Sequence, residues 1–504
     1  MNEQCAVDVL ICGAGAAGLT LAIDLARRGV RFRLIEKNHG PFNGSRGKGI
    51  QPRSQEIFED LGILNRLFAV GGVYPTERRY RDDGSYIGAD SIEHNAPTPA
   101  EPYPQPLMVP QFLTERVLRE RLLELGHQPE FACELMGFQQ DADGVTAQLV
   151  GNTGPQTLRT RWLVGADGGR SFVRHALNIE FPGKTLGVRA LVADVQLSGL
   201  SPQCWHRFGE GDLQRQIAIC PLAGTALFQI QAPIPLDADV DLSAAGLATM
   251  VAQRTGRGDI HVHAVSWASA YNMNARLADQ YRVGRVFLAG DAAHIHPPTG
   301  GQGLNTSVQD AYNLGWKLAA VANGAPETLL DSYEQERRPV AASVLGLSTK
   351  LLGSLQRGDM RRGREVHQLD IGYPQSSITF ENAERPGNLC AGDRAPDAPL
   401  LGAAGQTLRL FDLFKGTHWT LLGYGATSDS VPARRGLHIH HIGPQAEVVD
   451  IQGAFQDAYE LEVGERFGAW VLVRPDGYIG AIVASDQREA LERYFLQVGL
   501  SVKA

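Results

Sequence analysis

The first residues with evident chemical potential form a glycine-rich turn close to the N-terminus. Gly13, Gly15 and Gly18 are spaced as GxGxxG, between the apolar run Val7–Cys12 and a segment whose apolar residues recur at helical spacing. In such a turn the first glycine permits a tight bend, the second lets the backbone approach a pyrophosphate, and the third lets helix and strand pack closely. The free N–H groups at the start of the helix then bind the phosphates. The turn predicts a dinucleotide site; a glycine turn without a ligand is the alternative.

An acidic residue and two further turns extend this prediction. Glu36 ends the next apolar run, where its carboxylate can accept hydrogen bonds from adenosine ribose hydroxyls and would repel a 2′-phosphate. Asp167 follows the apolar run that ends at Gly165, and Asp291 follows the run that ends at Ala289. Ligands of open α/β sheets bind at such strand ends. Each turn alone could be an ordinary strand end, but Asp291 could hold ribityl hydroxyls, which NAD does not have, so the three turns together favour FAD.

The loop from His296 to Asn305 is the most informative stretch of the chain. Pro297 and Pro298 stiffen it and remove two backbone donors, whereas its glycines let the backbone run close to a flat ring. A helix is expected to begin near Leu304, with the positive end of its dipole directed at whatever lies in front. Negative charge on a reduced flavin would be stabilised there without reorganisation. The alternative is a loop that leads into a helix without a ligand.

Taken in chain order, the three motifs resemble those of the class A flavoprotein aromatic hydroxylases, the family typified by para-hydroxybenzoate hydroxylase. The resemblance covers about residues 5–370. It implies that the GxGxxG turn binds the ADP part of FAD, that Asp291 binds the ribityl chain, and that the turn at Asp167 serves both FAD and NAD(P)H. It also implies that Arg46 lies near the pyrophosphate and that Gln111 contacts the flavin side of FAD.

The resemblance provides a set of candidate site residues. Those expected to bind FAD are Gly13, Gly15, Ala16, Ala17, Gly18, Glu36, Lys37, Arg46, Gln111, Asp167, Asp291, Pro298, Gly301, Gly303, Leu304 and Asn305. Pro298 and Arg46 are also expected to act at the flavin during catalysis. His206 is a third catalytic candidate, because an imidazole titrates near neutral pH and could deprotonate a phenol, although an ordinary strand histidine is the commoner case. No metal site is expected.

The activity implied by the resemblance is aromatic hydroxylation. NADPH or NADH binds transiently and reduces FAD, O2 forms a flavin C4a-hydroperoxide, and one oxygen atom is transferred to an electron-rich ring. Epoxidation or Baeyer–Villiger oxidation on the same scaffold, and a non-catalytic FAD-binding protein, are the alternatives. The identity of the substrate, the position that is oxidised, the choice between NADH and NADPH, and the oligomeric state stay open.

The expected substrate is a phenolic or polycyclic aromatic compound, like a polyketide or an antibiotic. The stretch 181–275 offers the aromatic side chains Trp205, Phe208 and Phe228, which suit a bulky apolar ligand. It has few cations for a carboxylate clamp, and the exceptions are Arg189, Arg207 and Arg215. The proline-rich segment 96–110 could form part of the pocket mouth.

The elements around these motifs predict an α/β fold of three parts. Residues 1–180 and 276–370 are expected to form a discontinuous Rossmann-like FAD-binding domain, and residues 181–275 an inserted β-sheet domain that binds the substrate. Residues 385–504 resemble the C-terminal thioredoxin-like α/β domain of some family members, without a CxxC pair. This tail is expected to have a structural or oligomerisation role, for instance in a homodimer, and to be dispensable for flavin chemistry.

Composition limits the remaining function classes. The 504 residues carry a formal net charge of −8 without a long basic run, so nucleic acid is not an expected partner. The sequence has no apolar stretch long enough to span a membrane and no signal peptide at its start. Its six cysteines are scattered, which disfavours a disulfide framework or a zinc site and fits the cytoplasm. The expected partners are therefore small molecules: the aromatic substrate, O2 and NAD(P)H.

Overall fold

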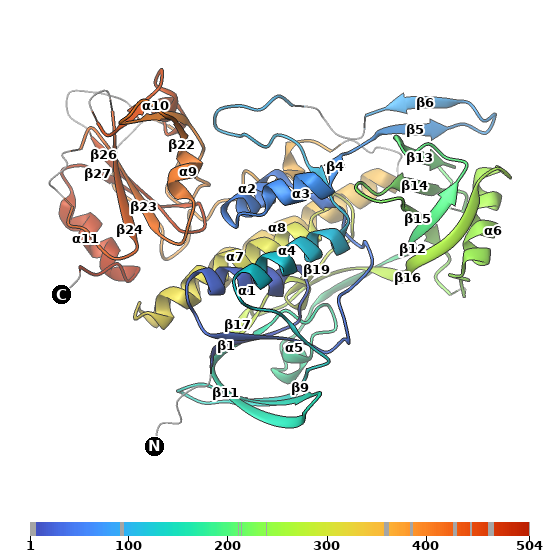
Figure 1. The fold of residues 1–504 in the computed structure, drawn as a ribbon, viewed down its shortest axis with the longest axis horizontal. Helices are drawn as coiled ribbons and strands as arrows, with labels where there is room; N and C mark the ends of the chain where they lie inside the picture. The colour runs from blue at the N-terminus through green and yellow to red at the C-terminus, as the bar shows by residue number, and fades with distance from the viewer. Residues whose placement is uncertain are drawn as a thin grey trace.

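The computed structural model describes residues 7–90, 95–209, 211–212, 214–237, 239–356, 362–383, 387–426, 431–443, 446–461 and 468–502. Three eight-stranded sheets and one three-stranded sheet organise this part of the chain. The long helices α7 and α8 lie in the middle of the view in Figure 1, with the first sheet below them, the second sheet on the right and the third at the upper left. The N-terminal and C-terminal ends of the chain lie on the same half of the molecule in this view.

The first sheet is built on parallel strands that are buried on both faces. Its strands, in spatial order, are β17 (Arg282–Val283), β18 (Val286–Leu288), β11 (Gly154–Gly165), β1 (Val7–Cys12), β2 (Phe32–Glu36) and β8 (Glu130–Phe131), with β9 (Glu134–Gln140) and β10 (Val145–Gly151) paired beyond β11. β1 pairs in parallel with both β2 and β11. The apolar sequence of β1 follows from this position, because central parallel strands have no solvent-facing side.

Helices cover this sheet and carry the loops of interest. They are α1 (Ala16–Arg27), α2 (Pro52–Asp60), α3 (Leu64–Val70), α4 (Gln111–Glu124), α5 (Phe172–Ala176), α7 (Gly303–Ala322) and α8 (Asp331–Gln356), with the short 3-10 turns η1 (Gly290–Ala292), η2 (Glu327–Leu330) and η3 (Arg364–Val366). The small three-stranded sheet joins β3 (Gly49–Ile50), β7 (Leu107–Met108) and β4 (Gly72–Val73). It fixes the loop before α2 to the end of the proline-rich segment. None of the described helices combines the length and apolar character that crossing a membrane requires.

The second sheet is larger than the inserted segment that the sequence predicts. Its order is β19 (His294–Ile295), β16 (His261–Leu277), β12 (Gly183–Ser198), β15 (Phe228–Ile234), β14 (Ile217–Pro221), β13 (Cys204–Phe208), β5 (Thr76–Tyr80) and β6 (Tyr86–Ala89). The hairpin β5–β6 comes from far upstream, and β5 pairs in parallel with β13. Non-local pairing of this kind leaves no signal in local sequence periodicity, which explains why the hairpin was not assigned to the sheet.

The two faces of the second sheet differ in chemistry. Helix α6 (Ala244–Thr255) covers one face, where Leu191, Ile219 and Ile230 pack against Leu247 and Val251 of the helix. Since side chains alternate along a strand, the neighbouring residues point to the opposite face, which we call the inner face. The inner face carries Asp194, Trp205, Arg207, Gln229, Gln231, Trp267 and Tyr271.

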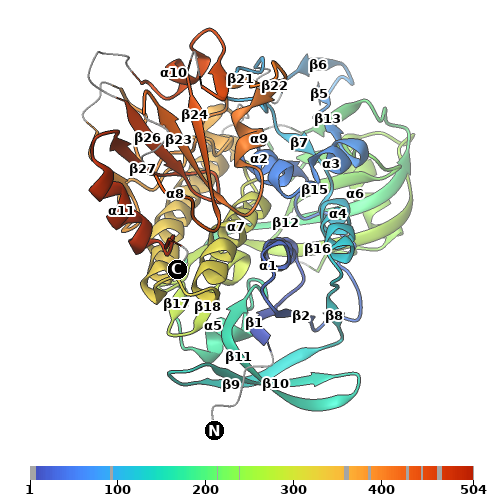
Figure 2. The same ribbon diagram turned by 60° about the vertical axis from the view of Figure 1, so that its left-hand side comes forward.

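The third sheet belongs to the C-terminal region. Its order is β20 (Phe380–Glu381), β27 (Ile479–Ala484), β26 (Ala469–Val473), β23 (Trp419–Tyr424), β24 (Leu437–Ile442), β25 (Val448–Asp450), β21 (Pro399–Gly402) and β22 (Thr407–Arg409), accompanied by α9 (Leu410–Phe414), α10 (Ala454–Ala458) and α11 (Arg488–Gln497). β23 and β24 are parallel, whereas β26 and β27 follow antiparallel and lead into α11. This is the thioredoxin-like arrangement that the sequence predicts, and it packs beside α7 and α8 (Figures 1 and 2).

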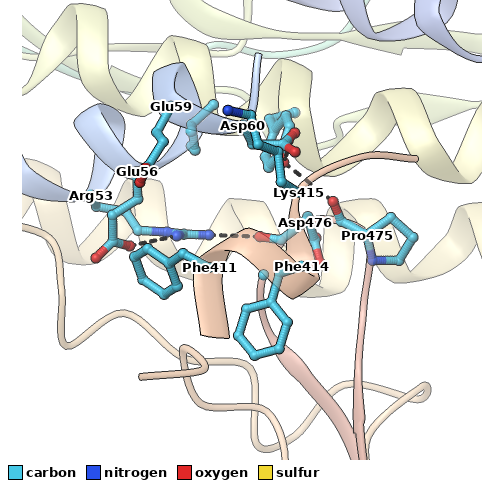
Figure 3. Close-up of a pocket in the computed structure, with 12 residues that line it drawn as sticks. Arg53, Glu56, Glu59, Asp60, Phe411, Phe414, Lys415, Pro475 and Asp476 are labelled. Atoms are coloured by element: carbon cyan, nitrogen blue, oxygen red, sulfur yellow. Dashed lines mark hydrogen bonds and ion pairs between the residues drawn. The ribbon is translucent and has the colours of Figure 1, made fainter. Parts of the chain in front are cut away.

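Polar contacts also join the C-terminal region to α2. Arg53 of α2 donates to the Glu56 carboxylate at 2.7 Å and to the backbone carbonyl of Asp476 at 2.6 Å (Figure 3). These groups line a small pocket of ≈ 40 Å³, whose far side is formed by Phe411 and Phe414 of α9 (Figure 3). A space of this volume holds little more than a water molecule or two, so we assign it to the interface rather than to a ligand.

Candidate functional site

The three glycine and aspartate turns meet at one edge of the first sheet. In the parallel register Cys12 lies beside Gly165, and Gly165 lies beside Leu288. The residues that follow these strand ends therefore emerge side by side, at the edge where open α/β sheets bind ligands. The structure thus brings together motifs that are separated by more than a hundred residues along the chain.

The GxGxxG turn has the shape that a pyrophosphate needs. Gly13 has φ +105°, and a Cβ atom there would collide with the carbonyl oxygen of Ala166. A Cβ at Gly18 would collide with the carbonyl oxygen of Gly13, so both glycines are required by packing. At Gly15, in contrast, a Cβ would meet only Glu115 Oε1, at 3.9 Å. The turn is therefore tight at its two ends and open in the middle, which leaves the start of α1 accessible to a ligand.

Glu36 lies beside this turn as predicted. Its Oε2 atom accepts a hydrogen bond from the Ala14 amide at 3.0 Å, and its Oε1 atom accepts one from the Asn38 amide at 3.0 Å. The carboxylate is half-buried; Oε1 also accepts from the side-chain amide of Asn38, whereas Oε2 keeps a lone pair for a ribose hydroxyl. Lys37 is exposed beside it.

Asp167 carries an unsatisfied oxygen at the same edge. Its Oδ2 atom accepts from the Val173 amide at 3.1 Å, at the start of α5. Its Oδ1 atom is buried and has no hydrogen-bond partner among the described residues. Arg174 fixes the turn by donating to the carbonyls of Ala292 at 2.8 Å and Gly169 at 3.0 Å, which ties the second motif to the third. An orphaned carboxylate oxygen fits a ligand hydroxyl, because buried polar groups are rarely left unpaired.

Asp291 is held in place by a buried network behind it. The Gly290 amide donates to Asp310 Oδ2 at 3.1 Å, and Asp310 also binds His294 Nε2 at 2.7 Å and Arg337 Nε at 2.8 Å. Asp291 itself is exposed. Desolvation by the surrounding chain nevertheless raises the pKa of Asp291, opposed by the positive field of nearby groups. A charge-assisted acceptor in this position fits the polyol part of FAD.

Hydrogen bonds join the loop before α7 to the loop before α2. Asn305 accepts from the Gln51 amide at 2.8 Å and donates to the carbonyls of Gly49 at 2.8 Å and Gly301 at 2.7 Å. No side chain caps the N-terminus of α7, so the first amides of this helix stay available to a ligand. Pro298 is exposed at the tip of this loop.

Arg46 lies between the two loops and the inner face of the second sheet. Its guanidinium carbon is 5.2 Å from the centre of the Phe42 ring and 5.9 Å from the Trp267 ring. Two neighbours anchor the segment to the sheet: Ser45 donates to Asp194 through its backbone amide at 2.8 Å, and Lys48 Nζ donates to Gln229 Oε1 at 2.7 Å. Arg46 therefore lies at the boundary between the second sheet and the edge of the first sheet that carries the three turns, which we call the cofactor edge.

Gln111 connects this boundary to α1 through a residue that sequence reasoning missed. The backbone amide of Gln111 donates to the Gly47 carbonyl at 2.9 Å, and its side-chain Nε2 donates to Glu115 Oε1 at 2.8 Å. Glu115 is buried beside the start of α1, where desolvation raises its pKa to about 7. The only signal was the spacing of Gln111 and Glu115, which places both on one face of a helix.

His206 is placed differently from the other catalytic candidates. It lies beside Ile219 on the face of the second sheet that packs against α6, opposite to the inner face. Its Nδ1 atom contacts the Tyr80 hydroxyl at 3.0 Å and its Nε2 atom contacts the Ser201 carbonyl at 2.8 Å. Burial lowers the pKa of His206. This geometry favours the ordinary structural role, because both ring nitrogens already have partners.

An apolar pocket of ≈ 250 Å³ opens where β14 and β15 turn. Its lining includes Val73, Met108, Leu222 and Phe228. Met108 lies in the proline-rich segment for which a place at the pocket mouth was expected, and it also packs in a small cluster with Trp205 and Cys220. The pocket therefore adjoins the inner face of the second sheet.

The remaining aromatic and basic candidates divide between the two faces and the surface. Phe208 is stacked on Tyr80 at 4.3 Å, on the side of α6. Arg189 and Arg215 lie toward the surface, and Arg215 pairs there with Asp82. Arg207 is buried on the inner face.

Comparisons with known proteins agree with this geometry. The model of a family described as "FAD binding domain" matches residues 6–348, and that of "Phenol hydroxylase, C-terminal dimerisation domain" matches residues 430–503. A flavin-dependent monooxygenase of Mycobacteroides abscessus is 42% identical over 483 residues, covering 95% of this chain and 97% of that protein. A rifampicin monooxygenase of Streptomyces venezuelae is 40% identical over 501 residues, covering 96% of this chain and 97% of that protein.

Solved structures give the same result for the whole chain. A ternary complex of aklavinone-11 hydroxylase with FAD and aklavinone superposes with a TM-score of 0.85 and 27% identity, covering 99% of each chain. A second complex, of a flavin-dependent monooxygenase with FAD and substrate, has a TM-score of 0.84 and 26% identity, covering 97% of this chain and 99% of the other.

Proposed function

The chain belongs to the flavin-dependent aromatic monooxygenases and binds FAD, and from this premise we propose that it hydroxylates a phenolic or polycyclic aromatic substrate with NAD(P)H as transient electron donor. The observation that carries the proposal is the junction at Arg46. There the cofactor edge of the first sheet, the uncapped start of α7 and the inner face of the second sheet converge on one segment. A ligand on the inner face would lie next to a flavin held by that edge.

The residues present fit FAD, as the open glycine turn and the orphaned Asp167 oxygen indicate. Glu36 would hold the adenosine ribose, the start of α1 the pyrophosphate, and Asp291 the ribityl chain. When bound, FAD supplies the chemistry that the side chains lack: reduction by a nicotinamide, activation of O2, and transfer of one oxygen atom to an electron-rich ring.

The protein contributes charge balance and positioning. The uncapped amides of α7 offer a fixed positive potential in front of the loop that contains Pro298. Asn305 fixes this loop against the segment that contains Arg46, so the two cannot separate without breaking buried hydrogen bonds. Preorganised dipoles of this kind stabilise developing negative charge without reorganisation during the reaction.

The proposed substrate class has support from the inner face and from the relatives. The apolar pocket beside Met108 and the aromatic residues of the inner face suit a ring system with a few polar anchors. Two similar proteins act, by their names, on rifampicin and aklavinone, which are large aromatic compounds. We extend this preference for large aromatic substrates to the present chain, together with assembly as a homodimer through the C-terminal region.

Product formation is the decisive test. Purified protein should contain FAD that acid precipitation releases, because no cysteine or histidine lies in a context expected for covalent attachment. With NADPH or NADH and 18O2, multi-ring phenols should give products with one labelled oxygen atom, measured by mass spectrometry in the presence of catalase. Reduced nucleotide consumption without a labelled product would show only uncoupled oxidation and would refute the proposed hydroxylation of these compounds. A labelled epoxide or ester would redirect the assignment to another oxygen insertion.

A further inference from the structure

The inner face of the second sheet carries more positive than negative charge. Besides Arg46 at its boundary, four cations lie on it or against it: Lys48, Arg79, Arg207 and Arg362. Only two carboxylates, Glu77 and Asp194, are close to them among the described residues. This excess of positive charge matters because burying a charge without a partner of opposite charge raises the free energy of the folded protein.

The two carboxylates already have partners other than Lys48 and Arg362. Glu77 is fully buried and accepts from Arg207 at 2.7 Å and from Arg79 at 3.1 Å, so it is shared by two guanidinium groups. Asp194 accepts from the backbone amide and the hydroxyl of Ser45. Burial raises the pKa of Asp194, which weakens it further as a counter-charge.

Lys48 is left without an ionic partner. The residue is only 8% exposed, and its Nζ atom donates to the neutral amide oxygen of Gln229. The ammonium lies 4.6 Å from the centre of the Trp205 ring, and Arg207 lies 4.2 Å from the same ring. Desolvation lowers the pKa of Lys48, and Lys48 forms no ion pair with a described residue.

Arg362 is a further cation whose charge reaches the same place. It follows α8 in the chain, and its charge acts on both Lys48 and the Tyr74 hydroxyl. Tyr74 itself packs near Trp205, with 6.3 Å between the ring centres. The guanidinium of Arg362 has no hydrogen bond or ion pair with any residue that the structure describes, and desolvation lowers its pKa.

We infer that Lys48, with the positive charge of Arg362 nearby, forms an anion-binding subsite that selects aromatic substrates with an ionised oxygen, either a carboxylate or an acidic phenol or enol. The inference rests on the proposed function and adds the charge of the substrate to it. An anionic oxygen at the Lys48 ammonium would provide the charged partner that the protein does not supply. Trp205 and Met108 would contact the adjoining ring, because they belong to the same cluster beside the apolar pocket.

The position favours a substrate over a nucleotide phosphate as the source of the anion. The pyrophosphate of FAD is assigned above to the open turn at the start of α1. The subsite lies instead on the inner face, next to Trp205 and the apolar pocket. A 2′-phosphate of NADPH shares the chemistry of the proposed ligand, and the experiment separates the two.

The test compares two matched probes on the FAD-loaded enzyme at pH 7.5. 3-Hydroxy-2-naphthoate and 2-naphthol share the ring and the hydroxyl but differ in the carboxylate, and their Kd values are measured from flavin fluorescence. The wild-type enzyme should bind the carboxylate about tenfold or more tightly than the neutral probe. Lys48→Gln should remove most of this difference and Arg362→Gln a smaller part of it, while both variants leave the Kd of 2-naphthol within about twofold. Lys184→Gln, an exposed lysine on β12, is the matched control and should change neither value.

Several results would overturn the inference. They are equal affinities of the wild-type enzyme for both probes, failure of the carboxylate to bind at millimolar concentration, and variants that weaken both probes alike. Weaker NADPH binding in the variants, with unchanged probe affinities, would assign the cations to the nucleotide instead. FAD content and circular dichroism report folding, and the conservative Lys48→Arg and Arg362→Lys variants should restore carboxylate binding. If the carboxylate binds selectively but no phenol is hydroxylated, the subsite stands and the proposed hydroxylation fails.

Discussion

The two sheets that flank the FAD-binding core are attached to it in opposite ways. The third sheet shares an apolar core with α7, where the rings of Trp316 and Trp419 meet edge to face at 5.3 Å. Next to them Glu336 accepts hydrogen bonds from Arg474 at 2.7 and 2.9 Å and from Lys317 at 2.7 Å, and all three side chains are fully buried. We call this interface the C-terminal seam.

The second sheet faces the core through polar groups instead. Its inner face contacts the segment around Arg46 by hydrogen bonds from Ser45 to Asp194 and from Lys48 to Gln229. We call this region the inner cleft. The difference indicates that the seam stabilises the fold, because opening it would expose paired charges and apolar surface. The inner cleft, in contrast, presents polar groups that a ligand can engage, so its residues should affect binding more than folding.

The largest effect should come from removing the C-terminal region after Gly387. The sequence alone predicts a dispensable tail. The seam predicts otherwise, because truncation removes Arg474 from the buried group around Glu336 and removes Trp419 from its contact with Trp316. Breaking a buried ion pair costs about 3–5 kcal/mol before the apolar loss is added. We expect an insoluble or molten product without FAD, measured by soluble yield, thermal unfolding and flavin absorbance against the full-length chain. A soluble truncated protein that binds FAD would contradict this expectation and show that the tail is dispensable for the cofactor site.

A single substitution, Glu336→Gln, tests the contribution of the C-terminal seam to stability without removing the tail. It keeps the shape but leaves Arg474 and Lys317 undercompensated, which should lower the free energy of unfolding by about 3–5 kcal/mol. The matched control Glu327→Gln removes an exposed carboxylate that pairs with Arg282 and should cost less than about 1 kcal/mol. Denaturant unfolding at pH 7 measures both. A loss below about 1 kcal/mol for Glu336→Gln would contradict the structural importance of the seam.

The pH dependence of that difference has a defined sign. The neighbouring cations hold the pKa of Glu336 well below its ordinary value, despite burial. Its stabilisation is therefore complete above the unfolded pKa, about 4.3, and is lost as the pH falls through the folded value. The stability gap between the wild type and Glu336→Gln should thus shrink in acid.

At the cofactor edge, Asp291→Ala should weaken FAD binding rather than reduce the stability of the fold. The ribityl hydroxyls would lose a charge-assisted acceptor worth roughly 1.5–3 kcal/mol, which corresponds to about a tenfold to hundredfold rise in Kd. Fluorescence titration of the apoprotein measures the effect, with exposed Asp237→Ala as control. An unchanged Kd would remove Asp291 from the cofactor site.

Glu115 should produce a smaller, pH-dependent effect on FAD affinity. Desolvation raises the pKa of Glu115 to about 7, so the carboxyl is largely protonated below that pH and becomes charged above it. A negative charge beside the start of α1 opposes a pyrophosphate, so the Kd of FAD should rise by up to about tenfold between pH 6 and pH 8. Glu115→Gln should flatten this profile. A wild-type profile that is already flat would place Glu115 outside the field of the pyrophosphate.

The smallest effect on chemistry is expected at His206. Both ring nitrogens have partners on the side of α6, so His206→Asn should leave the pH profile of kcat unchanged and affect mainly thermal stability, by about 1 kcal/mol. Loss of a limb near neutral pH in the kcat profile would instead make His206 a phenol base and would extend the inner cleft to the opposite face of the sheet.

The sequence anticipated those parts of the site that depend on local geometry. The GxGxxG turn, Asp167 and Asp291 each follow a buried strand, and the structure places all three at one sheet edge. Such motifs can be recognised because a strand, a turn and a helix start fit within a short stretch of chain. The thioredoxin-like order of the C-terminal region was anticipated instead from its resemblance to the tail of some family members.

The residues that sequence reasoning missed or misplaced depend on distant partners. Glu115 matters through its closeness to the start of α1, and Lys48 through Trp205 and Arg362, which lie more than a hundred residues away. His206 and Trp205 are neighbours in the chain, yet they point to opposite faces of one sheet.

The amino-acid sequence by itself therefore determined the cofactor and the family, and it predicted which turns carry the cofactor, because turn chemistry and strand burial are set by adjacent residues. Only the tertiary structure decided which face of the second sheet meets the cofactor edge, where the excess positive charge gathers, and how firmly the C-terminal region is joined to α7. These features depend on strand register and on packing between segments far apart in the chain. A shift of one residue along a strand would exchange the two faces without altering any local motif.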